Sequence, residues 1–216
     1  MAFDISAVFK NSFISLFTDP FIFGLAVIYT AISILFGFSV SSIGLKAVTV
    51  SNPSFPLSDL VYLLLYSVLF FLATTFITGV AFLRIGGKKK DINSVLNTAV
   101  KRYPALLGTT ILTGLMVAAG LIAFVIPGVY LTFKLIIAPV SSVIEKKSPV
   151  DAIRQSWSLT TGNWWYLFAL FLLLGIIVSV IGLLPYISYF FAFVIVIAYP
   201  FVFMAVIPHA KRKSRS

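Results

Sequence analysis

Cysteine is absent from this chain of 216 residues, histidine occurs once, as His209, and the acidic residues number only six. Without cysteine there is no disulfide, no thiolate ligand and no cysteine nucleophile. A zinc or two-metal site needs three or more converging ligands, which this composition does not supply. The basic run after Arg84 follows no strand and lacks the glycine spacing of a phosphate loop. The sequence therefore predicts a protein that is not an enzyme, with no catalytic residue, metal or cofactor.

Most of the few acidic residues stand where a helix is expected to begin. An Asp or Ser side chain at that position accepts hydrogen bonds from the free N–H groups of the first turn. This reading covers Asp4, Asp19, Asp59, Asp91 and Asp151, the last in the run Ser148-Pro149-Val150-Asp151. Glu145 is the exception, beside Lys146 and Lys147. It is either a surface charge or a member of a polar cluster with Arg154.

The chain has few charged residues and is rich in long apolar stretches. Hydrophobic residues make up 60% of the chain and charged residues 10%, and the mean hydropathy is +1.09, outside the range of soluble domains. A bilayer core of about 30 Å requires about 20 apolar residues of helix. Six stretches approach that length, at residues 20–45, 59–83, 104–126, 128–145, 164–183 and 186–208. We predict an all-α polytopic membrane protein with six transmembrane helices in a single integral membrane domain, residues 1–216.

Three amphipathic segments each precede a pair of these stretches, at residues 4–17, 91–103 and 149–161. Their apolar residues recur with helical periodicity, most clearly in the second segment. We expect three interfacial helices on the cytoplasmic side, with Trp157 of the third turned toward the bundle rather than toward water. The three units are either a true duplication or the product of a common need for amphipathic helices.

The basic residues fall almost entirely on one side of the predicted topology. If the N-terminus is cytoplasmic, only Lys46 lies outside and only Lys134 lies within a span. The other fourteen of the sixteen basic residues are then cytoplasmic: Lys10, Arg84, Lys88, Lys89, Lys90, Lys101, Arg102, Lys146, Lys147, Arg154, Lys211, Arg212, Lys213 and Arg215. Positive residues concentrate in cytoplasmic loops. We therefore predict a multi-pass protein of the cell membrane with both termini in the cytoplasm.

Lys134 is the one charge inside a predicted span, roughly 10 Å from its outer end at about 1.5 Å per residue. Its stem can snorkel to the outer boundary. Alternatively it faces the bundle interior and meets an anionic group, such as a lipid phosphate or a substrate, or belongs to an ion pathway. No acidic residue lies within a span to pair with it, which counts against the pathway.

Prolines and small residues within the spans indicate how the helices pack. Pro139 and Pro200 should kink their spans and leave carbonyls that a neighbouring hydroxyl or a water must satisfy. Small residues four apart allow helices to approach closely, as at Gly37 and Ser41, Thr75 and Gly79, Gly114 and Ala118, and Gly175 and Ser179. A group of hydroxyl residues either packs in the same way or lines a polar crevice: Thr109, Thr110, Thr113, Ser141 and Ser142.

One stretch of the chain resembles a known family. Its residues are Ile126-Pro127-Gly128-Val129-Tyr130-Leu131, Lys134-Leu135, Pro139, Ser148 to Trp157, Leu159-Thr160 and Gly162-Asn163-Trp164-Trp165. Residues 126–165 resemble the membrane domain of glycerophosphodiester phosphodiesterases and of related uncharacterised six-span proteins. The resemblance implies a six-helix membrane domain that, in the enzymes, is joined to a separate soluble catalytic domain. We expect no such domain in this chain, so the enzymatic activity is not carried over.

The expected partners are membrane lipids, anionic ones in particular, or else a membrane protein or a second copy of the chain. Nucleic acid is not expected, because the basic clusters are held against the membrane. The candidate contact residues are Lys134, Arg154, Glu145, Trp157, Lys88, Lys89 and Lys90. The alternative is a small transporter or export permease with a site between the spans near Lys134, which calls for an enclosed polar cavity.

Overall fold

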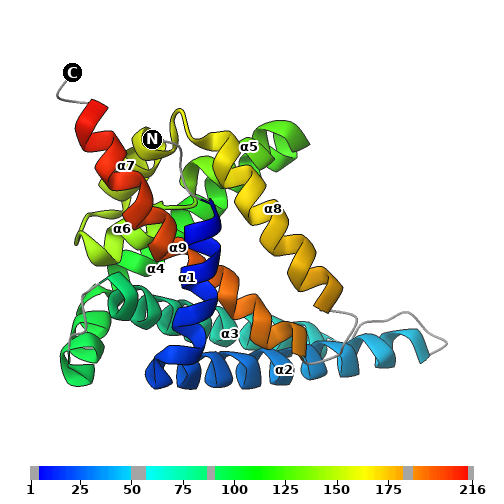
Figure 1. The fold of residues 1–216 in the computed structure, drawn as a ribbon. Helices are drawn as coiled ribbons and strands as arrows, with labels where there is room; N and C mark the ends of the chain where they lie inside the picture. The colour runs from blue at the N-terminus through cyan, green and yellow to red at the C-terminus, as the bar shows by residue number, and fades with distance from the viewer. Residues whose placement is uncertain (1–4, 50–56, 87–90, 182–186, 214–216) are drawn as a thin grey trace.

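The computed structural model describes residues 5–49, 57–86, 91–181 and 187–213, and over these ranges the chain is all-helical (Figure 1). Within them nine helices follow one another: α1 (Ile5–Thr18), α2 (Pro20–Thr49), α3 (Leu57–Gly86), α4 (Ile92–Ala123), α5 (Val125–Leu135), α6 (Ala138–Ile144), α7 (Pro149–Thr160), α8 (Trp164–Ile181) and α9 (Ile187–Lys213). The predicted all-α class is confirmed. The cap expected at Asp4, the residues Lys88 to Lys90 and the boundary between the fifth and sixth predicted spans lie outside the described residues.

Four helical segments are long and apolar enough to cross a membrane: Pro20–Ser41, Leu57–Gly86, Ile92–Ala123 and Val125–Ile144. The bent pair of α7 and α8 makes a fifth if it counts as one span. The apolar segment found in α9, Ala192–Ala205, is shorter. Over the described residues the protein therefore has four or five candidate spans, and six spans remain a prediction.

The first amphipathic segment forms a helix of its own. Helix α1 lies across the beginning of α2 rather than continuing it, and its start and the end of α9 lie toward the same side of the molecule (Figure 1). It packs against α9 and buries Val8, Ser12 and Leu16, which share one face. The helix ends before Asp19, whose carboxylate accepts from the N–H of Phe21 at 3.0 Å, as predicted for a cap.

The Asp19 carboxylate also joins α1 and α2 to α3. Arg84 donates from Nε to Asp19 Oδ2 at 2.8 Å and from a terminal nitrogen to Oδ1 at 3.3 Å. Burial alone raises the pKa of Asp19, but the hydrogen bonds from Arg84 and from the Phe21 backbone outweigh it and hold that pKa below its ordinary value. Asp19 therefore stays ionised and fixes the start of α2 to the end of α3.

The second amphipathic segment is not a separate helix, which corrects the boundary predicted at residue 103. It continues through Pro104 as the first part of α4, because Val95, Ala99 and Leu106 pack on one cluster with Val80 and Leu83 of α3. A helix of 32 residues is about 48 Å long at about 1.5 Å per residue, more than the roughly 30 Å of a bilayer core. Asp91 stands at the N-cap of α4, where the sequence predicts a helix start, but its side chain makes no capping hydrogen bond.

The fourth predicted span is interrupted, as Pro139 predicts. Helix α5 ends at Leu135, the chain passes through Ile136 and Ile137, and α6 begins at Ala138 with the proline in its first turn. Pro200, in contrast, lies inside the unbroken helix α9. The boundary between the third and fourth predicted spans, expected at residue 127, falls instead at Phe124, the extended residue between α4 and α5. Pro127 lies in the first turn of α5, where backbone N–H groups have no partner within the helix. The N–H that proline lacks therefore costs no hydrogen bond.

Candidate functional site

Helix α7 docks onto the break between α5 and α6. Its buried residues are Ala152, Ser156, Leu159 and Thr160. At the break the carbonyl of Lys134 accepts from Ser156 Oγ at 2.7 Å and from Thr160 Oγ1 at 3.2 Å. A carbonyl buried without a partner costs about 1–3 kcal/mol, so these hydroxyls make the interrupted helix tolerable. A hydroxyl, one of the two partners expected for carbonyls freed near Pro139, thus bonds the Lys134 carbonyl at the break.

The start of α7 also forms as predicted. Ser148 precedes Pro149 and accepts from the backbone N–H of Asp151 at 3.3 Å, while its own hydroxyl donates to the Asp151 carboxylate at 2.6 Å. At the other end, Gly162 adopts a φ of +89°, and the axes of α7 and α8 meet at 98°. The cap and the glycine corner fix both ends of α7 on the break.

The side chain of Lys134 is enclosed where α5, α7 and α8 meet. It is 4% exposed, and Nζ donates to Thr161 Oγ1 at 2.8 Å. The ammonium lies 5.5 Å from the ring centre of Tyr130 and 5.3 Å from that of Trp157, both within range of a cation–π interaction. Neither ion pair found among the described residues includes Lys134. Lys134 thus faces the protein interior and does not snorkel to the surface.

One face of the Trp157 ring packs against the protein interior, and the rest of the side chain is exposed. Its ring meets Tyr130 edge to face at 6.3 Å and covers Lys134, yet 42% of the residue is exposed. The prediction that it turns toward the bundle is right for this face only. The Nε1 of Trp164 approaches the Tyr130 carbonyl at 3.4 Å, and its ring stacks on Phe168 at 5.4 Å. An aromatic cluster therefore surrounds the buried charge.

Glu145 belongs to a polar cluster, although not with the predicted partner. Gln155 donates from Nε2 to Glu145 Oε2 at 2.6 Å and accepts a short hydrogen bond from Ser141 Oγ. Lys147 lies 3.6 Å from the same carboxylate. Arg154, the residue before Gln155 on α7, is exposed and lines a hollow of about 420 Å³ with Asp151 and Lys147. Of the two alternatives for Glu145, the structure thus shows a polar cluster, with Gln155 rather than Arg154 as the partner on α7.

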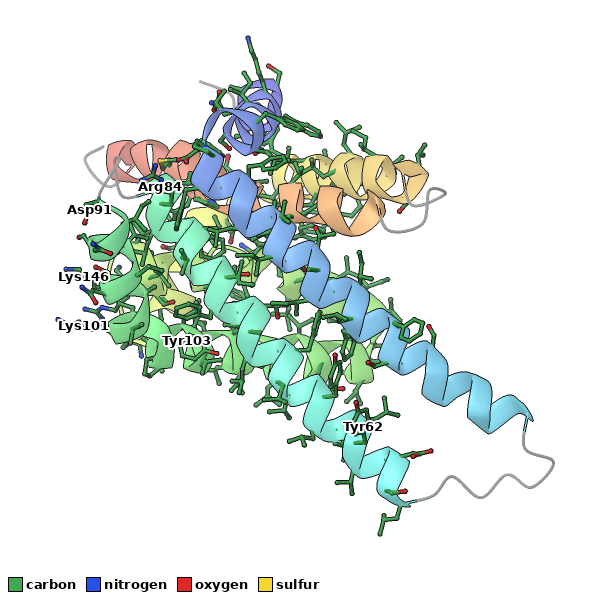
Figure 2. All side chains as sticks on the ribbon, turned by 90° about the horizontal axis from the view of Figure 1, so that it is seen from below. Tyr62, Arg84, Asp91, Lys101, Tyr103 and Lys146 are labelled. Carbon is green, nitrogen blue, oxygen red and sulfur yellow. The ribbon has the colours of Figure 1, made fainter. Side chains whose placement is uncertain are left out.

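Five cations gather at one edge of the described bundle. We call them the basic edge: Lys101, Arg102, Lys146, Lys147 and Arg154. Arg102 donates to the carbonyl of Lys146 at 3.1 Å, which joins α4 to the loop before α7. Figure 2 shows Lys101 and Lys146 beside Asp91 at the end where α3 finishes. Among the described residues, the ion pair of Lys147 with Glu145 is the one that involves this group.

A cleft of about 600 Å³ opens between α3 and α4, with contributions from α2, α5, α6 and α9. We call it the threonine cleft after Thr74, Thr75, Thr78, Thr110, Thr113 and Thr132, which line it. No charged residue is among the described residues that line it, and Lys134 does not contribute although its neighbours Leu135 and Ile136 do. Gly114 and Ala118, predicted to pack against another helix, face this cleft. A Cβ at Gly114 would meet no atom within 4 Å.

The site residues that the sequence missed are Gln155, Ser156, Thr160 and Thr161. Their signal was present, since a break at Pro139 leaves carbonyls that need donors and the segment 155–161 carries hydroxyl and amide side chains. Lys88, Lys89 and Lys90 lie outside the described residues. The remaining predicted site residues fall into two groups: Lys134 and Trp157 at the break, and Arg154 in the basic edge with Glu145 beside it.

These features define an all-helical, membrane-associated protein whose spans are joined by a docked helix and bordered by a basic edge. The chain belongs to the family described as a domain of unknown function, DUF7847, whose model matches residues 78–210. That range contains the break, α7, the basic edge and much of the threonine cleft. No curated protein and no solved structure matches the chain.

Proposed function

We propose that this is a non-enzymatic, six-span protein of the cell membrane that binds anionic lipid headgroups at its basic edge. The observation that supports this most is the gathering of five cations, which outnumber the three carboxylates beside them, Asp91 (Figure 2), Glu145 and Asp151. A Lys or Arg near the surface of an anionic leaflet contributes about 1 kcal/mol of attraction. The basic edge therefore has an unbalanced positive charge suited to headgroup phosphates.

The six-span topology is the finer part of the proposal. Helices α8 and α9 have 18 and 27 residues, so each is long enough to cross most or all of a bilayer by itself. Counted separately, they give six spans with α2, α3, α4 and the α5–α6 pair. Helices α1 and α7 then lie at the cytoplasmic interface, as the first and third amphipathic segments predict. The proposed relation to phosphodiesterase membrane domains concerns residues 126–165, which form α5, α6 and α7.

Single introduced cysteines test this topology without background, because the chain has none of its own. We expect a membrane-impermeant maleimide to label Asn52→Cys in intact cells. We expect Lys89→Cys, Ser148→Cys and Ser214→Cys to react only after the membrane is opened. Labelling of Ser148→Cys from outside, or of Asn52→Cys from the cytoplasm only, would contradict the proposed orientation.

Lipid binding is tested by replacing four charges of the basic edge with glutamine: Lys101→Gln, Lys146→Gln, Lys147→Gln and Arg154→Gln. Arg102 is retained because it bonds the Lys146 carbonyl. We expect the preference for phosphatidylglycerol over phosphatidylcholine, measured by native mass spectrometry, to fall by at least about tenfold, given about 1 kcal/mol for each charge. The wild-type preference should also weaken with salt, as exposed charges are screened.

The matched control is Lys134→Gln, which removes a charge that is enclosed rather than at the edge. This variant should keep the wild-type preference. If the fourfold variant keeps it as well, the basic residues serve only to set topology. If Lys134→Gln loses it, the anion site lies at the helix break. The transporter alternative gains no specific support, since the threonine cleft excludes Lys134 and has no charge in its described lining.

A further inference from the structure

We propose that the threonine cleft binds one hydrocarbon chain of a membrane lipid. Its volume of about 600 Å³ lies in the range of about 300–1,000 Å³ typical of ligand sites. It lies among helices α2 to α6, which include the four candidate spans, so hydrocarbon surrounds its open side. The headgroup part of this inference rests on the proposed function, whereas the chain part does not.

The chemistry of the lining favours a hydrocarbon over a polar ligand. Five of the threonine hydroxyls donate to carbonyls of their own helices: Thr74 to Phe70, Thr78 to Thr74, Thr110 to Leu106, Thr113 to Thr109 and Thr132 to Gly128, at 2.7 to 3.0 Å. These donors are used within the helix, so the cleft presents mainly methyl groups and apolar side chains. A polar ligand would lose water or headgroup contacts without gaining hydrogen bonds here.

The cleft is elongated along the helix axes. On α4 its lining runs from Leu106 to Leu121, about 22 Å at about 1.5 Å per residue. That length exceeds the hydrocarbon of one leaflet, about half of a core of about 30 Å. The cleft is thus long enough for one extended chain, and a compact solute would leave much of it empty. Since lipid outside is equally apolar, the chain gains from dispersion contacts with the walls rather than from leaving water.

One end of the cleft lies next to the basic edge. Leu106 lines the cleft, and Arg102 is one helical turn before it on α4. The basic edge therefore lies one turn from the Leu106 end of the cleft, although Leu106 itself is buried. This proximity of cations to an apolar cleft favours an anionic lipid as the occupant over a free fatty chain or a second protein helix.

The test places a larger side chain at a position that lines the cleft and has space around it. Gly114→Leu should be accepted by the fold, because a Cβ there meets no protein atom within 4 Å. Its control is Gly24→Leu on α2, where a Cβ also meets nothing within 4 Å and which does not line the cleft. The probe is a phosphatidylglycerol with a photoactivatable diazirine on one acyl chain, incorporated into nanodiscs with each variant.

In the wild type and in Gly24→Leu we expect crosslinks concentrated on residues 71–82 and 106–121. In Gly114→Leu they should fall by about tenfold, as a leucine overlaps the chain. Equal crosslinking in Gly114→Leu, or crosslinks spread evenly over the lipid-facing helices, would overturn the inference. Crosslinks between two copies of the chain, in place of lipid, would also overturn it. If Gly114→Leu fails to fold, Ala118→Phe fills the same cleft from an exposed position one turn later.

The two proposals fail separately. The same photoactivatable chain on phosphatidylcholine should still reach the cleft, more weakly, because the chain contacts do not depend on charge. If the fourfold basic-edge variant keeps its crosslinks and its phosphatidylglycerol preference, headgroup binding is wrong and the chain site stands. If lipid preference is lost as expected but no variant crosslinks in the cleft, the chain site is wrong and headgroup binding stands.

Discussion

A Gly128→Val variant is expected to melt about 6–12 °C below the wild type in detergent, on the basis of about 3 kcal/mol of overpacking. A Cβ at Gly128 would lie 2.7 Å from the backbone nitrogen of Leu121, and a Cβ at Gly120 would lie 3.0 Å from the Cα of Gly128. Backbone atoms cannot rotate away as a side chain does. Helices α4 and α5 would therefore have to separate along their contact.

Gly114→Val is the matched control, because it places the same side chain on α4 where a Cβ meets no atom within 4 Å. It should melt close to the wild type, as the helix propensities of Gly and Val differ by well under about 1 kcal/mol. Melting is followed by intrinsic fluorescence and by the monodisperse fraction on gel filtration. If both substitutions lower the melting temperature equally, the loss is caused by valine itself in α4 or α5. It is then not caused by the close approach of the two helix backbones.

The double substitution Ser156→Ala and Thr160→Val is expected to cost about 1–3 kcal/mol, because the buried carbonyl of Lys134 loses its donor Ser156 at 2.7 Å and also Thr160, whose single hydroxyl proton is shared between that carbonyl at 3.2 Å and the Ser156 carbonyl at 2.8 Å. In detergent this corresponds to roughly 2–12 °C of melting temperature. Limited proteolysis should also cut first in the segment that joins α7 to α8. The readouts are the melting temperature and the order in which fragments appear.

Ser158→Ala provides the comparison on the same helix. Ser158 is exposed, and its hydroxyl donates at 2.9 Å to the Gln155 carbonyl of its own helix. Removing that bond should leave the melting temperature nearly unchanged, as is usual for surface substitutions. If the double variant is as stable as Ser158→Ala, the docking of α7 does not depend on the Lys134 carbonyl.

The features predicted correctly from the sequence are those that depend on residues close together in the sequence. The cap formed by Ser148 and Asp151, the break at Pro139 and the cap at Asp19 each depend on a few consecutive residues. Apolar length likewise predicts helices of spanning length. Each of these signals acts within one or two helical turns, so no knowledge of the tertiary fold is required.

The incorrect predictions concern features that depend on contacts between segments far apart in the sequence. The pattern of residues 91–103 does not distinguish a free amphipathic helix from the first part of a long one, and packing of Val95 and Ala99 on α3 decides it. Similarly, only the docking of α7 against α6 selects Gln155, and not Arg154, as the partner of Glu145. The direction in which the Lys134 side chain points also depends on a distant residue, because its ammonium group bonds Thr161, which is 27 residues further along the chain.

That separation along the chain has a consequence during synthesis. Lys134 and its carbonyl enter the membrane with α5, but their partners Ser156 and Thr161 are made 22 and 27 residues later. A lysine near the centre of a span costs about 2.5–3.5 kcal/mol on insertion scales, and chains grow at about 5–20 residues per second. For a second or more, the half-made span carries an unshielded cation and a broken helix. Its final placement must therefore wait until α7 has followed and folded back against it.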